Sequence, residues 1–251
     1  MNNILKKLIL FIFLVIIVHL IFSGFIRPEA NILIENAKNS QTSIPRNFFI
    51  IVKDFEQEFC FILFFWGLII IFEKYFKILN SNYLFNIDLI ESKITNRESA
   101  DKLIGKINKQ LDSTLKNNPL IEALELALLR YSQTHNVQNV SDSISNSLEM
   151  LSIKQDSENS IIRYLIWAIP SVGFIGTVRG IGGALANADQ AIQGNISLMT
   201  ENLGVAFNST FVALLISIVL MFFFHQLQKV QDENIINIQK YCEKYFYSKF
   251  K

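Results

Sequence analysis

Apolar residues along this chain gather in four long blocks separated by polar segments. The blocks are Leu8–Ile26, Phe59–Phe72, Ala168–Ala186 and Asn202–Phe224. A membrane-spanning helix needs about 20 mostly apolar residues, and three of the blocks are close to this length. The second block has 14 residues, and it reaches across a bilayer if Glu58, Glu73 and Lys74 extend their charged ends to the interface. The pattern therefore predicts an all-α integral membrane protein with about four transmembrane helices.

Composition agrees with this pattern. Hydrophobic residues make up 51% of the 251 residues, with 22 Phe and only 4 Pro. Soluble domains distribute their apolar residues among amphipathic elements, whereas this chain concentrates them in blocks. The 23 Lys and Arg nearly balance the 22 Asp and Glu, and this net charge of +1 gives no indication of nucleic-acid binding.

The charges that flank the blocks predict the topology. Lys6 and Lys7 precede a first block that is longer than the roughly 7–15 apolar residues of a signal peptide, so we expect an uncleaved span with a cytoplasmic N-terminus. The link Asn187–Thr200 contains no Lys or Arg, as is typical of an external loop, whereas the tail after Phe224 is rich in lysine. We therefore expect both termini in the cytoplasm.

Four segments follow from this topology. Residues 1–79 hold the first two spans and an extracytoplasmic link, residues 80–160 form a cytoplasmic helical segment, residues 161–226 form a hairpin of two spans, and residues 227–251 form a cytoplasmic helical tail. The link covers residues 27–57, and its piece FFIIV at residues 48–52 is expected at the membrane interface.

Helical periodicity continues outside the blocks. Apolar residues repeat at intervals of three and four over Pro119–Thr134, and again over Val140–Leu151. We expect the second of these helices to extend into the third span. The tail His225–Lys251 has the same periodicity, so we expect it to continue the fourth span and to pack against residues 120–160 or against a neighbouring subunit.

Small residues form a stripe on the third block. They recur at spacings of three, four and three, and they are Gly173, Gly176, Gly180 and Gly183. Such stripes are helix packing faces in membranes. Thr177 and Arg179 lie on opposite flanks of the stripe, roughly 160° apart at about 100° per residue. They therefore cannot serve the same site on one helix.

A small and polar stripe also runs along the fourth block. Its members are Asn202, Ala206, Thr210, Ala213 and Ser217. Thr177 and Thr210 are separated by 33 residues, and their midpoint falls at the centre of the link Asn187–Thr200. Two antiparallel helices joined there would hold both hydroxyls at nearly the same depth. This hairpin is expected to line an ion path, since a hydroxyl donates and accepts hydrogen bonds without adding a fixed charge.

Two charged or titratable residues within the blocks need partners. Leaving Arg179 unpaired in the membrane would cost about 3 kcal/mol or more. It extends to the outer interface, pairs with an acid of a partner or neighbour, or sets the electric field at the outer mouth of the ion path. Asp189 and Glu201 are nearby candidates for the pairing. His19 in the first block is expected to make a local hydrogen bond.

The hairpin resembles the two core helices of the MotA/TolQ/ExbB proton-channel family. The resemblance rests on Pro170, Gly173 and the run Gly176-Thr177-Val178 with Gly180 and Ile181, followed by Ala206 and Thr210 before an apolar run. It covers roughly residues 160–230, and the spacing between the two threonines is preserved.

The resemblance implies a stator-type subunit of the bacterial inner membrane that assembles as a pentamer. Such a pentamer surrounds two copies of a single-span partner similar to MotB, TolR or ExbD, and the partner supplies an aspartate. Thr177 and Thr210 would face this aspartate along the path of protons or, alternatively, sodium ions, and Asn202 and Ser217 share their face.

Two positions depart from the pattern of the ExbB and TolQ branches. Arg179 stands where these branches usually have Trp, and Val205 stands where they have a glutamate. The chain therefore does not supply the carboxylate that a proton relay on this subunit would use, and it leans away from those two branches.

Enzymatic function is not expected. His19, His135 and His225 are scattered, Cys60 and Cys242 lie at unrelated spacing, and no hydrolase, metalloprotease or phosphate-binding motif is present. We expect no catalytic residues, no metal and no cofactor. Two readings of the function remain open. The first is an ion-driven motor subunit. The alternative is a membrane protein that works without such a partner, either as a structural or assembly protein or as a gated channel.

Overall fold

The computed structural model describes residues 3–40, 45–90, 94, 98, 100, 102–105 and 118–250. In this part of the chain the regular elements are helices, apart from an isolated β-bridge between Ile94 and Phe250. Four helical stretches are long and apolar enough to cross a membrane: Ile4–Asn39, Phe55–Asn86, Val137–Ala186 and Ser197–Lys249. The expected all-α architecture with four candidate spans is confirmed, and it includes the short second block.

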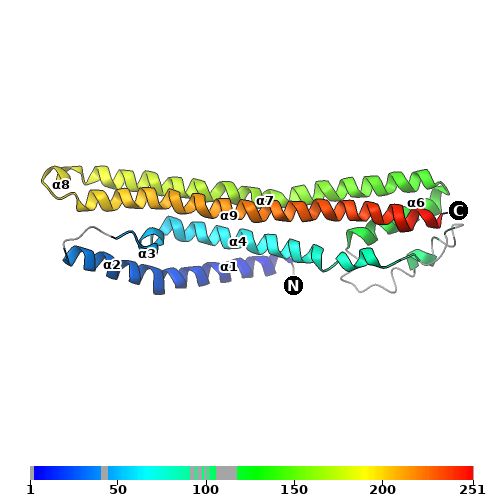
Figure 1. Cartoon of the computed structure of the whole chain (residues 1–251), viewed down its shortest axis with the longest axis horizontal. Coiled ribbons are helices and arrows are strands. Elements are labelled where there is room, and N and C mark those ends of the chain that lie inside the picture. The colour runs from blue at the N-terminus through cyan, green and yellow to red at the C-terminus, as the bar shows by residue number, and fades with distance from the viewer. Residues whose placement is uncertain are drawn as a thin grey trace. The chain divides into compact units, whose positions relative to one another are not determined.

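The chain divides into two compact units. The first comprises Met1–Ile71 and Ile161–Phe224, and the second comprises Phe72–Ser160 and His225–Lys251. The long helices of Figure 1, α4, α7 and α9, contribute residues to both units.

The first helix of the first unit is longer than its apolar block. α1 (Asn3–Ile21) continues through a π-helical turn, Phe22–Ile26, into α2 (Arg27–Asn39). Residues 27–39, which we expected to begin the link, therefore extend the helix instead. Pro28 lies in the first turn of α2, where a missing N–H is tolerated, directly after the wider π turn.

The second apolar block forms α4 (Phe55–Leu79), preceded by the short helix α3 (Phe48–Val52). The Asn47 side chain caps α3 by accepting a hydrogen bond from the Phe49 N–H at 3.0 Å. α4 begins before its apolar block, so Glu56 and Glu58 lie in its first turn, where carboxylates are favoured by the helix dipole. Glu58 is 4% exposed, and the expectation that it extends to the interface is wrong.

The third and fourth blocks lie on two long helices. α7 (Val137–Ala186) and α9 (Ser197–Tyr241) run side by side in Figure 1 and are joined through the short helix α8 (Ala188–Ile192), which lies in the predicted link. α7 continues through Pro170. The helix predicted over Val140–Leu151 therefore does extend into the third span, and the tail continues the fourth.

The second unit has its own apolar core. α6 (Pro119–Thr134) has the predicted bounds, and Asn118 caps it by accepting the Leu120 N–H at 2.9 Å. Buried residues from α6, α7 and the tail form one cluster, which includes Leu120, Leu124, Leu128, Val140, Ile144, Ile238 and Phe246. The prediction that the tail packs against residues 120–160 is confirmed.

Candidate functional site

The glycine stripe of α7 packs directly on the small residues of α9. A Cβ atom added to Gly180 would lie 2.6 Å from the Ala206 backbone nitrogen and 2.7 Å from the Asn202 carbonyl oxygen. The other glycines of the stripe likewise face α9: Gly173 faces Ala213, Ser209 and Thr210, Gly176 faces Ser209, and Gly183 faces Asn202. Only glycine leaves room for backbones this close. The two stripes predicted separately from the sequence therefore form a single interface within the hairpin.

Thr177 and Thr210 meet in this interface. Their hydroxyl oxygens are in direct hydrogen-bond contact, and the spacing of 33 residues predicts only a common depth for them. The Thr177 hydroxyl also lies 3.0 Å from the Ala206 carbonyl oxygen and 3.3 Å from that of Gly173. Thr210 Oγ1 lies 3.4 Å from the Gly173 oxygen. Both side chains are partly buried between the two helices.

This arrangement determines what the hydroxyl pair can offer to a ligand. Each hydroxyl has one proton and two lone pairs. Carbonyl oxygens and the mutual contact can take up both protons, which leaves lone pairs free to accept. The pair is therefore suited to a species that donates hydrogen bonds or carries positive charge, such as water, a hydrated proton or a sodium ion.

The two other residues assigned to the ion path lie on the same stripe but make separate contacts. The Ser217 hydroxyl, which is buried, donates to the Ile166 carbonyl oxygen at 3.0 Å. The Asn202 side chain donates to the Leu198 carbonyl oxygen at 2.9 Å within its own helix. The structure thus brings Thr177 and Thr210 together but not these two side chains with them.

Arg179 forms an ion pair within its own chain. Its Nε lies 2.5 Å from one carboxylate oxygen of Glu56, and its second terminal nitrogen lies 2.8 Å from the other. The partner of Arg179 within the chain is thus Glu56, and not the candidates Asp189 and Glu201. Glu201 lies 3.4 Å from the Lys38 ammonium instead.

Glu56 belongs to a buried polar turn, Glu56-Gln57-Glu58, at the start of α4. The three residues are 6%, 0% and 4% exposed. Glu56 contacts α7 through its ion pair with Arg179. Gln57 contacts α9, because its side chain donates to the Ser209 hydroxyl at 3.4 Å. The polar turn therefore ties α4 to both helices of the hairpin.

Glu58 connects the polar turn to the first helix. One of its oxygens lies 2.8 Å from His19 Nδ1, and the other is in contact with the Arg27 guanidinium. The expectation of a local hydrogen bond for His19 is wrong, because Glu58 is far from it in sequence. A carboxylate buried next to two nitrogen donors is compensated by them.

The polar turn cannot be recognised from the second apolar block alone. Its acids directly precede an apolar run, and in such a position charges usually extend to the interface. The signal that could have found it is a match between charges of opposite sign on different blocks. Basic or titratable residues occur within or directly after other apolar blocks, at His19, Arg27 and Arg179. The acids Glu56 and Glu58 could match them.

A metal centre has no support from the geometry. Across the described ranges, no group of three or more His, Cys, Asp or Glu side chains is placed to hold a metal ion. The features that remain are a hydroxyl pair between two apolar helices and charged side chains that neutralise one another within the chain.

This combination defines a multi-pass helical membrane protein whose hairpin carries polar groups at its centre. A sequence model described as the MotA/TolQ/ExbB proton channel family matches residues 106–240, more than half of the chain. The chain belongs to this family. No curated protein and no solved structure matches the chain.

Proposed function

We propose that this chain is the channel subunit of an ion-driven motor in the bacterial inner membrane, with both termini in the cytoplasm. The observation that carries the proposal is the contact between the Thr177 and Thr210 hydroxyls in a hairpin of a proton-channel family. Family membership makes a proton-channel, stator-type function the expected one, and the hydroxyl pair offers acceptors for a hydrated proton or a sodium ion.

The chain needs a carboxylate from elsewhere to complete such a path. Residues 161–186 and 202–224 contain no Asp or Glu, and the buried Glu56 and Glu58 are already engaged by Arg179, His19 and Arg27. A single-span partner with an aspartate, two copies of it inside a pentamer of this chain, would supply the missing group. Ion flow past this aspartate would then drive mechanical work.

The test replaces each hydroxyl by a methyl group of the same shape. In vesicles that hold the chain with its partner, Thr177→Val and Thr210→Val should abolish ion-driven uptake, because the acceptors are removed. Thr177→Ser and Thr210→Ser are the matched controls and should keep most of the flux. Native mass measurement should find the assembly unchanged in all four variants. Full ion flux in both valine variants would rule out the hydroxyl pair as part of the path.

A purely structural hairpin is the second candidate. The observation in its favour is that the hydroxyls reach carbonyl oxygens of the same hairpin, which satisfies them without any ion. The native mass of the complex from its source membrane separates the two candidates. Five copies with two of a smaller single-span protein support the motor. A homo-oligomer of another number without a partner supports an assembly role or a partner-free gated channel.

A further inference from the structure

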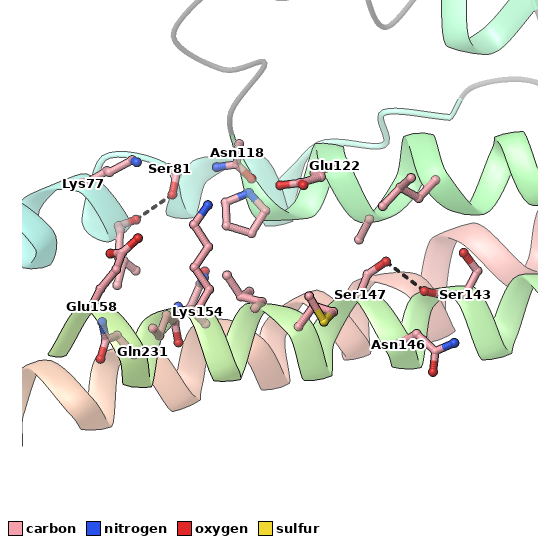
Figure 2. Close-up of a pocket in the computed structure, with 18 of the residues that line it drawn as sticks. Lys77, Ser81, Asn118, Glu122, Ser143, Asn146, Ser147, Lys154, Glu158 and Gln231 are labelled. Carbon is pink, nitrogen blue, oxygen red and sulfur yellow. Dashed lines mark hydrogen bonds between the residues drawn. The ribbon is translucent and has the colours of Figure 1, made fainter. Parts of the chain in front are cut away.

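The second unit contains a groove that the channel function does not use. Its volume is ≈ 1280 Å³, and the end of α4, the start of α6 and neighbouring parts of α7 and α9 line it (Figure 2). All of its lining residues belong to the second unit. The groove therefore does not depend on how the two units are placed.

Lysines are concentrated at one end of this groove. Lys74, Lys77 and Lys154 line it there, around the carboxylate of Glu158. The Lys74 ammonium lies 2.7 Å from a Glu158 oxygen. Within the described ranges, no ion pair is formed by Lys77 or Lys154. Figure 2 shows Lys154 extending into the groove toward the side that carries Ser81 and Asn118. Two ammonium groups at this end are thus available to a ligand.

The start of α6 adds to the positive potential at the same end. Asn118, which caps this helix of 16 residues, lines the groove. The N-terminus of a helix carries a partial positive charge and favours anions. Glu122 in the first turn of α6 is the opposing charge. The Asn118 side chain accepts from Leu120 through its oxygen, so its amide nitrogen can donate a hydrogen bond, which is what an oxyanion requires. The Ser81 hydroxyl already donates to the Ile78 carbonyl oxygen at 2.8 Å.

We infer that this end of the groove binds a phosphate group, and that a phospholipid headgroup is its main source. Lys74 and Lys77 follow directly after the apolar run that ends at Phe72, and Lys154 precedes the hairpin of two spans that begins at Ile161. At about 1.5 Å per residue, these lysines lie within roughly 11 Å of the ends of the spans, which is the depth of lipid headgroups. A soluble phosphate compound has the same chemistry and is the other source.

Apolar side chains among the otherwise polar lining of the groove suit the apolar part of a lipid. Ile78, Leu126 and Met150 line it, and Met150 is 66% exposed. Contact with a glycerol backbone or an acyl chain would cover these side chains. Basic pockets at the cytoplasmic ends of membrane helices favour anionic headgroups.

The experiment measures lipid retained by the purified complex in native mass spectra, after reconstitution with phosphatidylglycerol or with phosphatidylcholine. We compare Lys77→Ala/Lys154→Ala with Lys229→Ala/Lys240→Ala, whose lysines lie outside the groove. Each lysine near an anionic headgroup contributes about fivefold, so the groove variant should retain phosphatidylglycerol about 25-fold less well. The control variant should match the wild type, and circular dichroism should be the same for all.

A parallel arm adds inorganic phosphate or pyrophosphate to the complex in detergent without added lipid. Binding that the groove variant loses, together with no difference in lipid retention, would assign the phosphate site to a soluble compound. Equal retention of phosphatidylglycerol in both double variants, and no phosphate binding that depends on Lys77 and Lys154, would overturn the inference.

Discussion

The Arg179 guanidinium lies against both carboxylate oxygens of Glu56, at 2.5 and 2.8 Å. This ion pair joins α7 to the first turn of α4 and neutralises the strong charge of the third span within the chain. Arg179 therefore does not need the acid of a partner as its counterion. A partner's carboxylate remains available for the hydroxyl pair of Thr177 and Thr210.

Removing the two members of this pair should have unequal effects. The Glu56 side chain is 7% exposed and that of Arg179 is 56% exposed. Arg179→Gln leaves a buried carboxylate without its partner and should lower the free energy of unfolding by about 3 kcal/mol. Glu56→Gln keeps a side-chain oxygen that still accepts a hydrogen bond from the guanidinium, so Arg179 is not left unpaired and the cost should be about 1–2 kcal/mol. Thermal unfolding in detergent measures both effects.

Glu35→Gln is the matched control, because this exposed acid lies on α2 away from the polar turn. It should change stability by less than about 0.5 kcal/mol. The double variant Glu56→Gln/Arg179→Gln should be less destabilised than the two single effects combined. Simple additivity, or equal effects of the two single variants, would show that the pair does not act as described.

The glycine interface of the hairpin makes a second prediction. Gly180→Ala places a methyl group against the Ala206 and Asn202 backbones, which cannot move aside, and should destabilise the hairpin by about 1–3 kcal/mol. Gly182→Ala is the control from the same turn, since nothing lies within 4 Å of its added Cβ. It should be neutral or stabilising by up to about 1 kcal/mol. Equal melting temperatures for the two variants would argue against the close approach.

The sequence predicted those features that depend on periodicity along one helix. Spacing predicted the bounds of Pro119–Thr134, the continuation of α7 and α9 beyond the spans, and the common depth of Thr177 and Thr210. Because a polar link lies at the midpoint between the two threonines, the sequence predicts which residues of the two antiparallel helices lie at the same depth.

Pairings between blocks could not be predicted in this way. Glu56 and Arg179 are separated by 123 residues, and no periodicity connects them. Each block considered alone permits its terminal charges to extend to the interface, so Glu58 and His19 were also given the wrong surroundings. The helix over residues 27–39 was missed because Pro28 signals a break, whereas a proline in the first turn after a π turn is tolerated.

A third prediction concerns the core of the second unit. The Tyr241 hydroxyl accepts a hydrogen bond from the Leu89 N–H at 2.9 Å and donates to the Ile87 carbonyl oxygen at 3.0 Å. Tyr241→Phe should therefore release this segment and cost about 1–2 kcal/mol. Amide hydrogen exchange around Leu89 should become faster, whereas Tyr245→Phe should leave it unchanged. Unaltered exchange in Tyr241→Phe would mean that the segment is held by other contacts.

Gln57 allows the sharpest test of the polar turn. Its side chain is fully buried. Its amide nitrogen donates to the Ile51 carbonyl oxygen and to the Ser209 hydroxyl, whereas its Oε1 has no hydrogen-bond partner among the described residues.

Gln57→Met keeps the side-chain volume and removes the unsatisfied oxygen. This partly offsets the loss of two hydrogen bonds, so the net cost in stability should be about 1 kcal/mol or less. Gln57→Glu places a third carboxylate beside Glu56 and Glu58, and it should cost about 3 kcal/mol or more at neutral pH. Because protonation removes that charge, the difference between the two variants should shrink as the pH falls. Thermal unfolding of both variants from pH 8 to about pH 4 measures this convergence, and a difference that is already small at pH 8 would place Gln57 in a more polar environment than the structure describes.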